Sequence, residues 1–146
     1  YALTVQARDI AGNAAGQLDY KIDFEVITES KLSNVLNYPN PFSTSTRFVY
    51  TLTGDAVPQN YMIQIMTVSG RIVRELTQDD LGPLKIGTHQ TEFAWDGTDA
   101  YGNRLANGVY LYRMLAKDQN GKEFAKYDNG TDRFFKNGIG KLVILR

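Results

Sequence analysis

The sequence predicts an all-β protein: a β-sandwich of about seven strands, preceded by a β-hairpin. Three observations support this prediction. Apolar and polar residues alternate in short runs, turn-forming residues separate these runs, and no segment keeps the spacing of an amphipathic helix over three turns. A chain of 146 residues is long enough for one domain and a piece of another.

The first 27 residues are predicted to form the hairpin. Alternation runs from Tyr1 to Ala7 and from Tyr20 to Val26, and a small, turn-rich segment separates the two runs. Because two strands alone are marginally stable in water, we expect the hairpin to pair with a second copy of the chain or to lie across an edge of the sandwich. We place a polar linker at residues 28–33 and the sandwich at residues 34–146.

The strands of the sandwich are predicted from the runs that follow. Pro39 and Pro41 exclude a central strand, and the peptide bonds before them are the plausible cis bonds of this region. Ser69–Gly70 suits a tight hairpin turn. We expect strands over residues 46–52, 61–67, 72–76 and 88–95.

The stretch from Trp95 to Arg113 organises the second half of the chain. It joins two runs of alternation through a polar connection with three glycines, two aspartates and two asparagines, which are residues that favour turns. Trp95, the only tryptophan, is expected to anchor the core. Further on we expect a strand over residues 109–116, a turn at Asp118–Gly121 and a short strand near Phe124 and Tyr127.

The final apolar run is the sharpest candidate for a binding site. Four apolar residues lie between two cations, so we expect a strand that is covered on both faces. A partner protein would recognise this strand as it adds to, or leaves, a sheet edge. The alternative is an internal strand that seals the sandwich, and both can hold. The predicted partner-binding residues are Lys141, Leu142, Val143, Ile144, Leu145 and Arg146.

Composition narrows the possible functions. Sixteen basic and sixteen acidic side chains cancel, so we expect no nucleic-acid partner. The chain has no cysteine, which removes disulfides, thiolate nucleophiles and cysteine-bound zinc. No apolar run approaches the roughly 20 residues of a transmembrane helix. We expect no cofactor and no enzymatic activity.

Five blocks from residue 37 onward occur together and in a fixed order. They are Asn37–Phe42, Val68–Val73, Trp95–Asp99 with Gly102, Gly108–Arg113 and Gly140–Arg146. The blocks resemble the immunoglobulin-like C-terminal domains of flagellar hook-capping proteins and the C-terminal sorting domains of the Bacteroidetes type IX secretion system. The loop Ala7–Asn13 resembles a loop near the end of bacterial immunoglobulin-like modules, so we expect the hairpin to end such a module in a longer protein.

The resemblance implies an immunoglobulin-like sandwich that acts as an address and an anchor. Such domains direct export of a larger protein to the cell surface, by way of the periplasm. Their partners are the type IX translocon of the outer membrane and its shuttle and sortase proteins. The resemblance therefore implies a secreted or cell-surface location. Self-association through residues 1–27 is a further possible contact.

Sites for chemistry are few. Asp96, Asp99 and Asn103 are weak candidates for a calcium site, because they lack the dense spacing of a strong calcium loop and more often cap turns. Asp128–Asp132 is a similar and weaker case. His89, the only histidine, is expected to be exposed rather than catalytic, and Asp79–Asp80 to be a solvated loop.

Two other functions are kept open. One is an adhesive or carbohydrate-binding sandwich, for which Tyr101 and Phe42 would supply the contact surface, because both lie outside the apolar phase of the strands. The other is a structural, self-assembling subunit like the flagellar hook cap.

Overall fold

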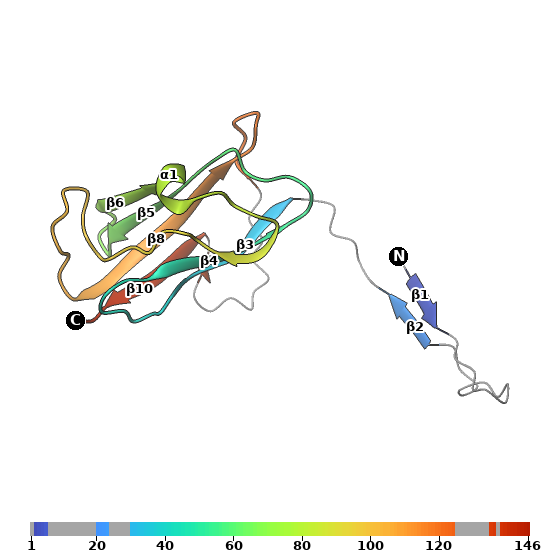
Figure 1. Cartoon of the computed structure of the whole chain (residues 1–146), viewed down its shortest axis with the longest axis horizontal. Coiled ribbons are helices and arrows are strands. Elements are labelled where there is room, and N and C mark those ends of the chain that lie inside the picture. Colours follow the sequence, from blue (N-terminus) through green and yellow to red (C-terminus); the bar gives the residue numbers. More distant parts are fainter. Residues whose placement is uncertain (1, 6–19, 24–29, 125–134, 137) are drawn as a thin grey trace.

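The computed structural model has the predicted all-β architecture (Figure 1). It describes residues 2–5, 20–23, 30–124, 135–136 and 138–146. A five-stranded antiparallel sheet, ordered β6-β5-β8-β10-β9, faces a three-stranded sheet, ordered β3-β4-β7. The strands of the first sheet are β5 (Asn60–Thr67), β6 (Ile72–Thr77), β8 (Gly108–Lys117), β9 (Phe135–Lys136) and β10 (Ile139–Ile144). Those of the second are β3 (Lys31–Tyr38), β4 (Arg47–Thr53) and β7 (Gly87–Gln90).

The N-terminal hairpin forms a sheet of its own. β1 (Ala2–Val5) pairs with β2 (Tyr20–Asp23), and the register sets Leu3 opposite Ile22 and Val5 opposite Tyr20. This sheet is separate from the two sheets of the sandwich. Pairing with a second copy, or packing across an edge of the sandwich, remains a prediction, and the Ala7–Asn13 loop lies outside the described residues.

The sandwich begins earlier than expected. Residues 31–33, which we assigned to the linker, are the first residues of β3 and pair with Thr51–Thr53 of β4. Leu32 is fully buried there, and Ser33 is buried as well. Three residues of a polar stretch thus lie in an edge strand, where a single buried leucine is enough to hold them against the core.

The core fills the space between the sheets with large side chains. Trp95 is 1% exposed, as predicted, and its indole N–H donates to the Thr98 carbonyl at 3.0 Å. Phe48 of β4 meets Tyr112 of β8 edge-on, with ring centroids 5.2 Å apart. The Tyr112 hydroxyl donates to the Val35 carbonyl at 2.9 Å, which links the two sheets through a buried hydrogen bond.

The chain changes sheets at the two prolines. Tyr38–Pro39 and Asn40–Pro41 are both cis, at the bonds predicted to be candidates. After β3 has paired with β4, this turn carries Phe42 to the other sheet, where it forms a parallel bridge with Ile144. Residues near the start of the sandwich therefore lie against its last strand.

Three local elements differ from the prediction. One helical turn, α1 (Gln78–Leu81), was missed because four residues are too few to show a period, although Thr77 and Asp80 form a capping box. β7 ends at Gln90, short of the predicted strand end at residue 95. β10 is not covered on both faces, because burial alternates along it. Tyr127 lies outside the described residues.

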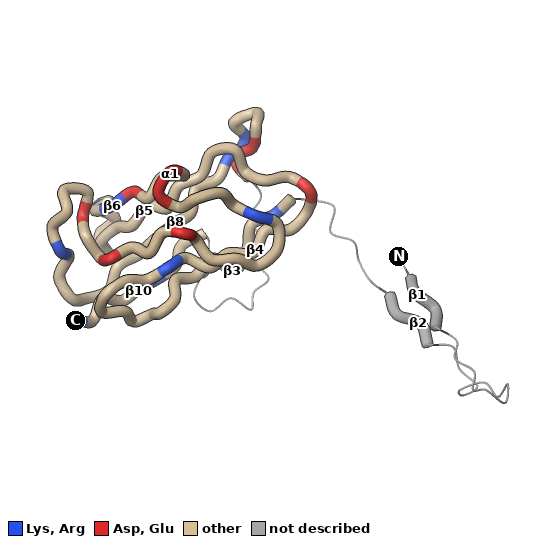
Figure 2. The backbone as a smooth tube through the Cα atoms, viewed as in Figure 1, with Lys and Arg blue, Asp and Glu red and all other residues tan. Residues whose placement is uncertain are grey.

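Charged side chains of both signs are interspersed over the described loops and strands (Figure 2). Within the described residues, no helix has the length and apolarity needed to cross a membrane.

Candidate functional site: the last strand and its contacts

The last strand, β10, has neighbours on both sides. On one side it pairs antiparallel with β8, with Leu142 opposite Tyr110 and Val143 opposite Val109. On the other side Phe42 supplies two backbone hydrogen bonds. Its N–H donates to the Val143 carbonyl at 3.0 Å, and its carbonyl accepts from the Leu145 N–H at 2.9 Å.

Asn40 extends this second row of hydrogen bonds. Its side-chain Nδ2 donates to the Lys141 carbonyl at 2.9 Å, and its Oδ1 accepts from the Val143 N–H at 2.9 Å. The proline that follows has no N–H to donate. The side-chain amide of Asn40 therefore makes the two hydrogen bonds to β10 that a backbone peptide group of a neighbouring strand would make.

Arg146 closes the end of the sandwich. Its guanidinium donates to the Leu105 carbonyl at 2.7 Å and to the carbonyls of Asp96 and Gly97 at 2.8 and 3.3 Å. Its backbone pairs with the Asn107 amide in both directions, at 3.0 Å each. A charged donor shared among carbonyls makes stronger hydrogen bonds than a neutral one, so these contacts hold the chain end against the 96–107 loop.

Two glycines permit these close contacts. A Cβ at Gly97, where φ is +76°, would lie 2.6 Å from the Arg146 Nη2. A Cβ at Gly140 would overlap the Tyr112 ring. The hydrogen atom of glycine is the only side chain that fits at either position.

The predicted partner-binding residues divide into two groups. Leu142 and Ile144 point into the core and are fully buried, while Lys141 and Leu145 are exposed and Val143 is half-buried. The strand thus helps to seal the sandwich, as in the alternative reading. An added strand would reach the side of residues 141–145 only by displacing Asn40 and Phe42.

Sequence reasoning missed the residues that hold β10. The sequence places Asn40 and Gly97 within two of the blocks without indicating a partner for either, and Asn107 only within a polar connection. The available signal was the order of the blocks, since the first, third and fifth blocks supply Asn40, Gly97 and Arg146. Asn40 and Val143 are 103 residues apart in the sequence, so no local sequence pattern indicates that they are in contact.

Asp96, Asp99 and Asn103, the weak calcium candidates, form hydrogen bonds within their own loop. The Asp96 carboxylate accepts from the N–H and hydroxyl of Thr98 at 3.2 and 2.7 Å. The Asp99 carboxylate accepts from the N–H groups of Tyr101 and Asn103 at 2.8 and 2.9 Å and from the Asn103 side chain at 3.2 Å. In the described part of the chain, no three His, Cys, Asp or Glu side chains are grouped to hold a metal ion.

Hydrogen bonding also changes the acidity of this loop. The backbone N–H of Asn103, then the Asn103 side chain and the Tyr101 N–H, hold the pKa of Asp99 below its usual value of 3.8, and the Arg74 charge adds to this effect. The carboxylate is ionised at neutral pH and keeps the turn closed.

The remaining candidates fall at separate places. His89 lies on β7 and is exposed, with Nε2 2.9 Å from the Ile86 carbonyl. Asp80 caps α1 through the Thr77 N–H at 3.0 Å. Tyr101 is 90% exposed, but Phe42 is 2% exposed and packs on Trp95 with ring centroids 5.6 Å apart. The assignment of Phe42 to a contact surface was therefore wrong, because the sheet change turns it inward.

Comparison with known families decides the relationship. Residues 38–128, which are more than half of the chain, match the FlgD Ig-like domain family. The chain belongs to the FlgD Ig-like domain family. This confirms the immunoglobulin-like sandwich and the resemblance drawn from the five blocks.

A solved structure shares the fold of this FlgD Ig-like chain. It is the crystal structure of dimeric latent PorU from Porphyromonas gingivalis, with 22% identity and a TM-score of 0.55. The match covers 99% of this chain but only 12% of PorU. No curated protein matches the chain.

We predict that Asn40→Asp destabilises this FlgD Ig-like domain although the two side chains have the same shape. The carboxylate cannot donate to the Lys141 carbonyl, and the loss of one such hydrogen bond costs about 1–3 kcal/mol. Urea unfolding measures the change, and Asn120→Asp, in an exposed turn, is the matched control. Equal stability of the two variants would contradict the role of Asn40.

A second prediction concerns pH. Because the pKa of Asp99 is depressed in the folded domain, its contribution to stability is present above about pH 4 and is lost as the pH falls through the folded pKa. In an NMR titration, the Asp99 carboxyl should titrate below 3.8. Asp99→Asn should remove that part of the acid dependence of unfolding. A titration midpoint at or above 3.8 would refute the assignment.

Proposed function

We propose that this domain is a non-enzymatic module that directs export and cell-surface attachment of a larger protein through the type IX secretion system. The observation that carries the proposal is the convergence of the blocks at β10. Asn40, Gly97 and Arg146 come from three blocks, and all contact the last strand or its end. Because the same blocks carry the resemblance to the type IX sorting domains, we take the place where they meet as the part of the domain that a common partner contacts.

Only the exposed side chains of the last strand are available for a receptor protein to contact. Leu142 and Ile144 are core residues, so they hold the strand in place and are not free to contact a partner. Lys141, Val143 and Leu145 point to the outer face of the five-stranded sheet. We infer that the translocon or its shuttle protein contacts these three side chains, and that the folded sandwich presents them as one surface.

The parent protein is expected to be secreted or held at the cell surface. In this proposal the activity of the parent protein belongs to other parts of it, and the match to PorU, which covers 12% of that chain, is consistent with a small module of a larger protein. The domain itself, in this proposal, performs recognition and no chemistry.

We predict that residues 31–146, fused behind a signal peptide and a reporter, export the reporter in a type IX-competent strain. The double variant Lys141→Ala and Leu145→Ala should lose export but keep its melting temperature, because both side chains are exposed.

The control for this experiment is Val68→Ala with Lys122→Ala, which removes an exposed apolar and an exposed basic side chain elsewhere. It should export normally. If the reporter stays in the periplasm while a known sorting domain exports it, the proposed function is wrong.

A structural, self-assembling role like that of the hook cap is the second candidate, and the outer face of the five-stranded sheet favours it. The face carries apolar residues on three strands: Ile72, which is exposed, Leu111, which is half-buried, and between them Met66, which is only 8% exposed. Isolated exposed apolar residues are ordinary, but a contiguous patch points to an interface. The polar residues Glu75, Gln64 and Arg113 cross the same face, hydrogen-bonded to one another at 2.5 and 2.7 Å.

Light scattering separates the two candidates. If the sandwich assembles through this face, the wild-type chain is a dimer or larger and Leu111→Glu is a monomer, because a buried unpaired charge opposes association. A wild-type chain that remains a monomer over a wide range of concentrations would exclude the hook-cap-like role.

A further inference from the structure

Asparagine followed by glycine occurs four times in the chain, at Asn107, Asn120, Asn129 and Asn137. In such a pair the backbone nitrogen of the glycine can attack the side-chain amide carbon of the asparagine, because no Cβ crowds the approach. This reaction, deamidation, is one reason why asparagine is a thermolabile residue. Asn107–Gly108 and Asn120–Gly121 lie within the described residues, and the asparagine is exposed in both pairs.

The amide of Asn107 is held by a residue that comes 39 positions later. Its Nδ2 donates to the Arg146 carbonyl and its Oδ1 accepts from the Arg146 N–H, at 3.0 Å each. Gly108, whose nitrogen would attack, is the first residue of β8 and lies opposite Ile144 of β10. The two groups that react are therefore both fixed by residues 144–146.

The contacts with Arg146 oppose the reaction. The amide carbon has to turn onto the Gly108 nitrogen before a bond can form, and a side chain bound at both Nδ2 and Oδ1 turns only when its hydrogen bonds break. Burial gives no protection, since Asn107 is exposed to the water that completes the reaction. The hydrogen bonds to Arg146, rather than burial, therefore protect this asparagine.

Asn120 gives a contrast within the same chain. It lies in the turn after β8, where its backbone N–H donates to the Asp118 carboxylate at 2.8 Å and the Gly121 N–H donates to the Asp118 carbonyl at 3.0 Å. These contacts come from a residue of the same turn, so they do not depend on the last strand. Asn120 therefore serves as an internal reference for the same reaction.

We propose that Asn107–Gly108 is a deamidation site that residues 144–146 keep closed and that reacts when the last strand leaves the sheet. The Gly108 nitrogen bonds to the Asn107 Cγ and loses its proton, the bond from Cγ to Nδ2 breaks, and ammonia departs. Water then opens the resulting ring on either side of that nitrogen, which gives aspartate or isoaspartate. The carboxylate of either product has no N–H to donate to the Arg146 carbonyl, so one of the two bonds is lost permanently. The inference is independent of the export function, since it rests on the contacts of Asn107 and Gly108.

The test follows each asparagine of the full chain by peptide mapping with mass spectrometry, because the exchange of ammonia for water changes the mass of the peptide that contains it. In the folded wild-type protein, Asn107 should deamidate at least about 5-fold more slowly than in concentrated urea, where both hydrogen bonds to Arg146 are absent. The same rate in both conditions would overturn the proposal.

Two variants of Arg146 separate its backbone from its side chain. Arg146→Pro and Arg146→Ala both lose the guanidinium contacts, but only the proline removes the N–H that donates to the Asn107 Oδ1. Asn107 should therefore deamidate about 3- to 10-fold faster in Arg146→Pro than in Arg146→Ala, while Asn120 reacts at the same rate in both. Equal rates at Asn107 in the two folded variants, or a matching rise at Asn120, would overturn the proposal.

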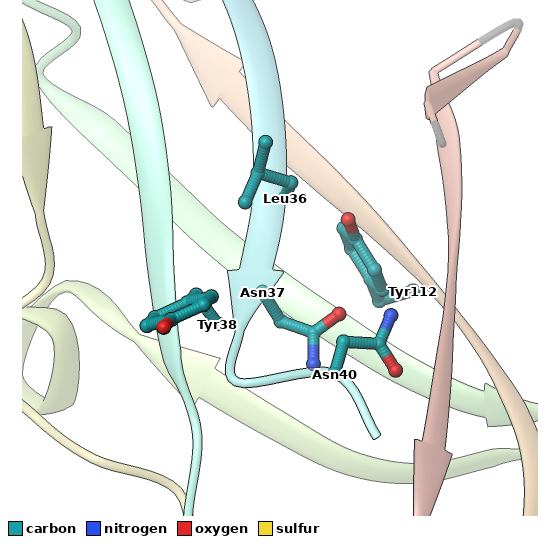
Figure 3. A pocket seen from close by; sticks show the side chains of 5 residues that line it. All are labelled: Leu36, Asn37, Tyr38, Asn40 and Tyr112. Carbon is teal, nitrogen blue, oxygen red and sulfur yellow. The ribbon is translucent and has the colours of Figure 1, made fainter. Parts of the chain in front are cut away.

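A third variant weakens the last strand from its other side. Asn40 lies in the turn after β3 with its amide directed at β10, where it bonds to Lys141 and Val143 (Figure 3). Asn40→Asp removes the bond to the Lys141 carbonyl, so it should raise the rate at Asn107 about 3-fold or more and leave the rate at Asn120 unchanged. This variant carries the test if Arg146→Pro does not fold. A rate at Asn107 that stays at the wild-type level would show that opening of β10 does not release the amide, and the proposal would be wrong.

Discussion

The hydrogen bonds between the proline turn and β10 are the contacts on which the sandwich depends. Most of its strands are joined by neighbours close in sequence, as β5 is to β6 and β3 to β4. β10 instead closes the structure by pairing with β8 and with Asn40 and Phe42, which lie about a hundred residues earlier. Because Leu142 and Ile144 of this strand are fully buried, the core is complete only when these bonds are made.

This arrangement also explains why the five blocks are found together. Pro39 and Pro41 direct the chain to the other sheet, and the Asn40 side chain supplies the hydrogen-bond donor that a proline lacks. Gly97 leaves space for the Arg146 guanidinium, which donates to carbonyls of the 96–107 loop. Each of these residues is unremarkable in isolation. Together they form one set of contacts that joins the proline turn and the 96–107 loop to the last strand.

Much of the fold was predictable because strand alternation is local. The strands β4, β5, β6 and β8 were expected within one or two residues of their observed bounds, since period-two burial is visible in the sequence. The prediction that both faces of β10 are covered was wrong for a physical reason. Its four consecutive apolar residues suggested two covered faces, yet Val143 and Leu145 lie on an outer face that is itself rich in apolar residues. The contacts of the candidate site were not predictable, because Asn40, Asn107 and Arg146 meet only through tertiary structure.

The proline turn has a consequence for the order of events in biogenesis. A nascent chain holds Asn40 and Phe42 long before the ribosome has made Val143, so their hydrogen-bonding partners do not yet exist. Closure therefore waits until residues 140–146 have been made, and non-local pairing of this kind is slow. Until then the core lacks Leu142 and Ile144, two of its fully buried side chains.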